Sequence, residues 1–129
     1  MANIAWIFIG GGLGSLARYG LSLAALRWQS PGKGSELGTL GFPWGTFSAN
    51  VLASALAGVL MAWLLSQQDA VQWRAFGLIG FCGGFSTFSS FSLEAFQLFH
   101  SGQAAMALVY ITASFLSCIL AVWLGMKLW

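Results

Sequence analysis

Charged residues are nearly absent from this sequence. Of its 129 residues only 6% are charged, with five Lys or Arg against three Asp or Glu. Soluble globular domains carry roughly 25% charged residues, so the composition excludes a soluble domain and predicts an integral membrane protein. The net charge of +2 is also too small to indicate a nucleic-acid partner or a strong attraction to anionic lipid.

Metal-ligating and catalytic side chains are scarce as well. His100 is the sole histidine, and the two cysteines, Cys82 and Cys118, show no metal-ligand spacing. An intramembrane hydrolase needs a nucleophile paired with a base, and the sequence has no Gly-x-Ser-x-Gly turn. The sequence therefore predicts that the protein is not an enzyme. Both cysteines fall within apolar stretches, so they say little about the redox compartment.

Apolar sequence, by contrast, is abundant. Hydrophobic residues make up 58% of the chain, and four apolar stretches, at about 3–26, 43–66, 75–99 and 103–128, exceed the ~20 residues that a membrane-spanning helix needs. The first stretch has no Lys or Arg ahead of it and contains Arg18, which is typical of a retained helix and not of a cleaved signal peptide. We expect an all-α, multi-pass protein of the plasma membrane, with a single domain (1–129) of four transmembrane helices.

The third stretch contains a polar segment, GFCGGFSTFSSFSLE at 80–94. Gly83 and Gly84 weaken a helix, and the Ser and Thr side chains that follow can bond to nearby backbone instead. These features predict a helix break near 83–87, in the middle of the membrane. Freed backbone groups are tolerated at that depth only where protein buries them or where they line a watery cavity, and the broken helices of transporters bind ions.

Two aromatic rings and a carboxylate follow the expected break. Phe88 and Phe91 are three residues apart, which places them on one helical face and suggests a pore wall. Glu94 lies three residues further on, and an ionisable side chain within a span is a functional hypothesis by default. The alternative for Glu94 is a carboxylate near a helix end that reaches water or the Arg18 side chain.

Polar side chains also interrupt the first two spans. Arg18 is expected to face an aqueous vestibule or a partner inside the bundle, or else to extend to the membrane interface. Asn50 either joins helices by hydrogen bonding or donates its NH2 group to an anion in a pore. An amide suits the second role because it offers two donors without a charge that would trap the ion.

The first and fourth spans carry two further patterns. Gly10 and Gly14 form a pair of small residues four positions apart, which indicates close helix packing. In the fourth span Tyr110, Ser114 and Cys118 repeat every four residues and share one stripe of the helix. This stripe is either a seam of interhelical hydrogen bonds or a polar track along which a small ion moves.

Three segments together resemble the Fluc family of fluoride channels, also called CrcB. They are GGGLGSLARYG from Gly10, GTFSAN at the head of the second span, and the polar segment at 80–94, which is the specific one. The resemblance extends over all four spans in order. It implies an antiparallel homodimer of dual-topology subunits, with a structural sodium ion at the dimer interface and two pores through which fluoride leaves the cell passively.

The resemblance also implies roles for individual residues. Two positions depart from the family pattern: Ser90 stands where threonine is common, and Cys118 stands where a serine is common, so the order of hydroxyls along the track stays open. The matching positions are Asn50, Thr87, Phe88, Ser89, Phe91, Tyr110 and Ser114 for the fluoride pore, Arg18 for the vestibule, Glu94 for polar support, and the backbone carbonyls of Gly83 and Ser86 for the sodium ion.

The distribution of positive charge bears on orientation. With four spans, the N-terminus, the 67–74 link and the C-terminus share one side of the membrane, and the 27–42 loop and the turn at 101–102 share the other. Once Arg18 is left within its span, each side carries two basic residues: Arg74 and Lys127 on the first, Arg27 and Lys33 on the second. The positive-inside rule then favours neither orientation, so the sequence predicts insertion in both.

Two other classes of protein stay open at this point. A proton-coupled exporter of the small multidrug class also has four short spans, and it would need a carboxylate deep in a binding chamber, for which Glu94 is the only candidate. A structural or assembly protein is the other, although the polar break at 83–87 would then have no purpose.

Overall fold

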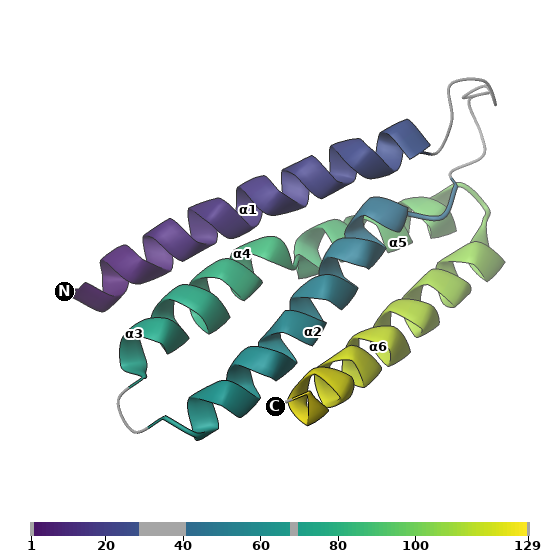
Figure 1. Cartoon of the computed structure of the whole chain (residues 1–129). Helices are drawn as coiled ribbons and strands as arrows, with labels where there is room; N and C mark the ends of the chain where they lie inside the picture. Colours follow the sequence, from purple (N-terminus) through teal and green to yellow (C-terminus); the bar gives the residue numbers. More distant parts are fainter. Residues whose placement is uncertain (1, 29–40, 68–69, 129) are drawn as a thin grey trace.

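All regular secondary structure in the described residues is helical, with no strand among them (Figure 1). The structure, a computed structural model, describes residues 2–28, 41–67 and 70–128, so the expected loop at 27–42 lies mostly outside the described residues. Four helical segments within these ranges are long and apolar enough to cross a membrane, which confirms the all-α architecture. The elements are α1 (Ala2–Trp28), α2 (Trp44–Leu65), α3 (Val71–Trp73), the π-helix η1 (Arg74–Cys82), α4 (Gly83–Phe85), α5 (Phe88–His100) and α6 (Ala104–Lys127).

The spans run side by side, and each runs opposite to the one before it (Figure 1). α1 packs on η1 and α4, and α6 packs on α2. α2 also contacts α1 and η1, so it joins the two pairs. The start of α1 and the end of α6 lie at the same end of the bundle as α3 (Figure 1). At the opposite end, α5 and α6 are joined by a tight turn in which Gly102 takes a positive φ of 78°.

α1 approaches the third span closely through two glycines on one face. A Cβ atom at Gly10 would overlap the backbone carbonyl of Phe76, and a Cβ atom at Gly14 would overlap that of Phe81. Two backbones meet this closely only where a residue has no side chain. The pair at Gly10 and Gly14 is therefore a packing motif.

α2 and α6 approach each other in a similar, reciprocal way. A Cβ atom at Gly58 of α2 would overlap the carbonyl of Val122 in α6, and a Cβ atom at Gly125 of α6 would overlap the carbonyl of Ala55 in α2. This close contact fixes α6 against α2 along the half of the bundle that contains the C-terminus of α6.

The third span changes direction after α4. Gly83 and Gly84 are themselves helical, and α4 ends at Phe85. Ser86 then has an extended backbone, with ψ of 156°, and Thr87 likewise, with φ of −149° and ψ of 118°. Thr87 is the N-cap of α5, because its hydroxyl accepts a bond from the amide of Ser90 at 3.2 Å. The two non-helical residues thus follow the glycine pair and are closed off by a hydroxyl cap.

Candidate functional site

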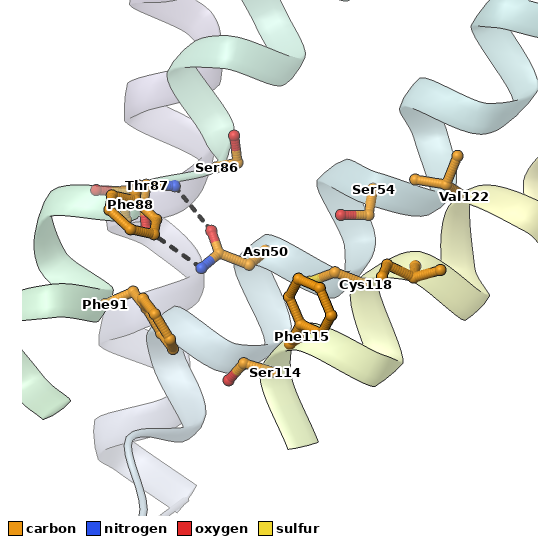
Figure 2. Close-up of a pocket in the computed structure, with 11 residues that line it drawn as sticks. Asn50, Ser54, Ser86, Thr87, Phe88, Phe91, Ser114, Phe115, Cys118 and Val122 are labelled. Carbon is orange, nitrogen blue, oxygen red and sulfur yellow. Dashed lines mark hydrogen bonds between the residues drawn. The ribbon is translucent and has the colours of Figure 1, made fainter. Parts of the chain in front are cut away.

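An open groove of about 380 Å³ lies beside these two non-helical residues. Figure 2 shows its lining, which combines hydroxyl, amide and thiol groups with apolar side chains from α2, α5 and α6. No charged side chain is found among the described residues that line it. The lining residues are Asn50, Ser54, Ser86, Thr87, Phe88, Phe91, Ser114, Phe115, Cys118, Ile119 and Val122.

The Asn50 amide pairs with the backbone of Thr87 through two hydrogen bonds (Figure 2). The amide N–H of Thr87 donates to Asn50 Oδ1 at 2.7 Å, and Asn50 Nδ2 donates to the carbonyl oxygen of Thr87 at 3.2 Å. A backbone N–H can only donate and a carbonyl can only accept, so this pairing determines the orientation of the amide. The NH2 group has two donors, and the bond to Thr87 uses one of them, which leaves the second for a ligand.

This pairing also changes the bonding of the preceding turn. In a continuous α-helix the amide of Thr87 would donate to the carbonyl of Gly83, four residues earlier. It donates to Asn50 instead, so the Gly83 carbonyl is released from that bond. Gly83 is exposed, and a Cβ atom there would meet nothing within 4 Å. A backbone acceptor and open space therefore lie close to the donor-lined groove.

Aromatic rings form one wall of the groove and continue into the bundle. The centroids of Phe88 and Phe91 are 5.7 Å apart with the planes tilted by 39°, and those of Phe91 and Tyr110 are 5.2 Å apart with a tilt of 48°. Phe88 is 79% exposed, whereas Tyr110 is fully buried. The three rings thus make a row that begins at the open rim and ends inside the protein.

The α6 side of the groove contains an unsatisfied hydroxyl. Ser114 Oγ is buried and has no hydrogen-bond partner among the described residues. One helical turn further along α6, Cys118 lines the same groove as a free thiol. Most buried polar groups have a partner, so an unpartnered hydroxyl in the wall of a groove indicates a place for a ligand or water.

Glu94 lies outside the groove lining, in a hydrogen-bonded cluster that joins three helices. Thr46 of α2 donates from Oγ1 to Glu94 Oε1 at 2.6 Å, and Tyr110 of α6 donates from its hydroxyl to Oε2 at 2.7 Å. In the described part of the chain the partners of Glu94 are therefore these two hydroxyls and not Arg18.

Sequence reasoning did not find this role for Thr46. A Thr in a helix commonly bonds its own backbone, and 48 positions separate Thr46 from Glu94. Tyr110, which the family resemblance placed in the pore, has its hydroxyl on Glu94 and lies outside the groove lining, whereas Ser114 on the same stripe lines the groove. The stripe thus combines an interhelical bond with a groove-lining hydroxyl.

Of the remaining predicted site residues, Ser86 lines the groove, and Arg18 and Ser89 lie outside its lining. Arg18 is half-buried on α1, outside the groove lining. Ser89 is exposed at the start of α5, with Oγ 3.1 Å from Thr87 Oγ1. Ser86 lines the groove, and its hydroxyl donates to the carbonyl of Cys82 at 2.9 Å. The structure therefore brings Asn50, Thr87, the two phenylalanines and Ser114 together and leaves Arg18 apart.

A cation in this protein would depend on backbone oxygens. The described residues contain no group of three or more His, Cys, Asp or Glu side chains that could hold a metal ion. Carbonyl oxygens can replace the hydration shell of an alkali cation, and the carbonyl of Gly83 is released from its usual helical bond. The Gly83 carbonyl is therefore a backbone oxygen that could contribute to such a site.

Comparison with known proteins places the chain in a family. A family model described as CrcB-like protein, Camphor Resistance (CrcB), matches residues 5–126. A relative from Magnetococcus marinus, named fluoride-specific ion channel FluC, is 42% identical over 126 residues, which are 96% of this chain and 94% of the relative. Relatives of the same name from Agrobacterium fabrum and Pyrococcus horikoshii are 38% and 42% identical, covering 99% and 95% of this chain and 96% and 91% of their own. The resemblance carried by the three sequence segments is confirmed: the chain belongs to the CrcB family.

Proposed function

We propose that this protein is a fluoride-selective channel that lets fluoride leave the cell passively across the plasma membrane. The observation that carries the proposal is the groove beside Thr87, which presents hydrogen-bond donors and ring edges without a charged side chain among its described lining residues. The relatives that match nearly the full chain are named fluoride-specific ion channels, and four helices of spanning length fit a multi-pass membrane protein.

The groove offers an anion donors that do not hold it permanently. The second N–H of Asn50 and the unpartnered hydroxyl of Ser114 can both donate to an anion. Phe88 and Phe91 add the positive edges of their rings. Fluoride is small and strongly hydrated, so its water must be replaced by donors, and conduction requires that each site bind weakly enough for the ion to leave.

The exporter alternative gains no support. Each relative described above is named a channel. Glu94 accepts bonds from two hydroxyls and lies outside the groove lining, whereas a coupling carboxylate is expected to face the transported substrate.

A liposome experiment tests the channel proposal directly. Purified protein is reconstituted into vesicles loaded with fluoride or chloride, and a potassium ionophore sets the voltage. We expect rapid fluoride efflux and negligible chloride efflux. Phe88→Ile and Phe91→Ile keep apolar bulk but remove the polarised edge, so each should fold and lose most of the flux. Comparable efflux of chloride would contradict selectivity, and unchanged flux in both variants would show that the rings only pack.

We propose further that two copies pair antiparallel, with the non-helical residues of each third span meeting in the middle of the membrane. Open space beside Gly83 leaves room for a second copy, and the balance of basic residues favours neither orientation. A single cysteine at Ser101→Cys, on a background of Cys82→Ser and Cys118→Ser, should react with an impermeant reagent in about half of the molecules in intact cells. Labelling near zero or near completeness would mean one fixed orientation.

A structural sodium ion at the dimer interface completes the proposal. Carbonyl oxygens of Gly83 and Ser86, contributed by both copies, would hold it, and its charge would stabilise the facing ends of the two interrupted helices. We expect a lower midpoint of thermal unfolding in choline chloride than in sodium chloride of equal ionic strength. Equal midpoints in the two salts would contradict a structural sodium site.

A further inference from the structure

A second cavity, of about 180 Å³, lies at the other end of the described molecule from the α5–α6 turn, where α2 ends and the third span begins. Met61, Leu64 and Val71 provide apolar walls, and Gln67 and Arg74 provide polar groups. None of these residues lines the groove beside Thr87. Among the described residues that line it, the cavity therefore combines apolar side chains with one positive charge, at a helix end.

The surroundings of the cavity are those of a membrane interface. The rings of Trp63 and Trp73 meet edge to face, with centroids 6.0 Å apart, next to the cavity in sequence. At the same end of the bundle, Lys127 Nζ lies 4.1 Å from the centroid of the Trp123 ring. Tryptophans and basic residues concentrate at the level of lipid headgroups. The cavity thus opens where headgroups and the first part of the acyl chains are found.

Arg74 is the one charged side chain among the described residues that line the cavity. Its side chain is exposed, and the described residues make no hydrogen bond or ion pair with its guanidinium. A guanidinium binds phosphate oxygens in a bidentate manner. The apolar walls exclude a simple anion as the intended ligand, because a free anion gains nothing from Met61 or Leu64.

We propose that this cavity binds an anionic glycerophospholipid. The phosphate lies on Arg74, and the glycerol end of one acyl chain packs against Met61, Leu64 and Val71. The volume, equal to about six water molecules at ~30 Å³ each, holds this first part of the lipid, while the rest of the chain lies along the bundle in the bilayer. The attraction is local to Arg74, so it does not depend on the small net charge. It is also independent of the proposed fluoride conduction.

Native mass spectrometry of the purified full chain with added phosphatidylglycerol tests the proposal. The matched variants are Arg74→Gln and Arg27→Gln, which remove the same charge at opposite ends of the bundle; both side chains are exposed. We expect about five-fold weaker lipid binding for Arg74→Gln, as follows from the usual strength of one basic residue near anionic lipid, and wild-type binding for Arg27→Gln. Arg74→Lys should retain most of the binding.

A cavity-filling variant and two alternative ligands complete the experiment. Ala70→Phe fills the cavity without changing charge and should also weaken phosphatidylglycerol binding; it decides the question if Arg74→Gln does not fold. Phosphatidylcholine should bind more weakly than phosphatidylglycerol, and inorganic phosphate should not displace the bound lipid. The proposal is overturned if the two Gln variants lose binding equally, if phosphatidylcholine binds as tightly, or if inorganic phosphate competes.

Discussion

The α1 side of the bundle and the groove side differ in what lies between their helices. Between α1 and the third span, backbone meets backbone, because Gly10 and Gly14 leave no side chain in the way of the Phe76 and Phe81 carbonyls. Around the groove, side chains bridge the helices, as Asn50 does to Thr87 and Thr46 does to Glu94. The α1 side is held by close backbone packing, whereas the groove side adds hydrogen bonds between helices to the close contact of Gly58 and Gly125.

This difference follows from the bilayer as a solvent. Lipid tails are as apolar as the helix surfaces, so burying apolar area between helices stabilises them little, and close packing or polar contacts must do so instead. Close packing leaves no space for a ligand. Polar contacts leave donors beside open space, so the conducting site is expected on the hydrogen-bonded side.

The largest effect is expected from added volume on the α1 side. Gly10→Leu would drive a side chain into the Phe76 carbonyl and should destabilise the fold by about 3 kcal/mol or more, measured as loss of monodisperse protein and a lower midpoint of unfolding in detergent. Gly12→Leu is the matched control, because a Cβ atom at Gly12 meets nothing within 4 Å. Equal unfolding midpoints for the two variants would show that close backbone packing at Gly10 does not hold the α1 side together.

A smaller loss of stability and a large loss of function are expected at Asn50. Asn50→Leu leaves the Thr87 N–H and carbonyl without their partners, which costs about 2 kcal/mol, and should lower fluoride flux at least ten-fold. Asn50→Asp keeps the acceptor but loses the donor, so it should also fail to conduct. Ser48→Ala, on the same helix but outside the groove lining, serves as control. Wild-type flux in Asn50→Leu would show that the amide is only structural.

The cluster around Glu94 should respond more modestly. Thr46→Val and Tyr110→Phe each remove one bond to the carboxylate and should each destabilise the fold by about 1.5 kcal/mol, measured by thermal unfolding. Thr46→Ser keeps the hydroxyl and should stay close to wild type. Each of these variants can also be combined with Glu94→Gln in a double-mutant cycle. If the losses of stability of the two single variants add up in the double variant, the residues do not form a shared cluster.

The smallest effect on stability is expected at Ser114. Its hydroxyl has no partner among the described residues, so Ser114→Ala should change stability by less than about 0.5 kcal/mol while lowering fluoride flux. Ser117→Ala, on the same helix but outside the groove lining, should change neither quantity. A clear loss of stability in Ser114→Ala would mean that the hydroxyl is structural. The groove side would then have no hydroxyl at this position available for a ligand.

Several features of this protein were determined by local sequence alone. A bilayer sets the length of a span and tolerates few charges, so composition was sufficient to identify four spanning helices. The small residues at Gly10 and Gly14 indicated close packing because they lie on one helical face. An interruption near 83–87 followed from glycine and hydroxyl residues; the structure has extended residues at Ser86 and Thr87, and its place in the middle of the membrane stays a prediction.

The choice of hydrogen-bond partners was decided only by tertiary structure. The sequence marked Asn50 as a donor, but its pairing with the backbone of Thr87, 37 positions away, depends on which face of α2 meets the third span. Thr46 and Tyr110 could bond many groups, and their meeting at Glu94 requires three helices in register. A polar side chain in a span specifies that a partner is needed, and only the packing of the helices decides which partner is within reach.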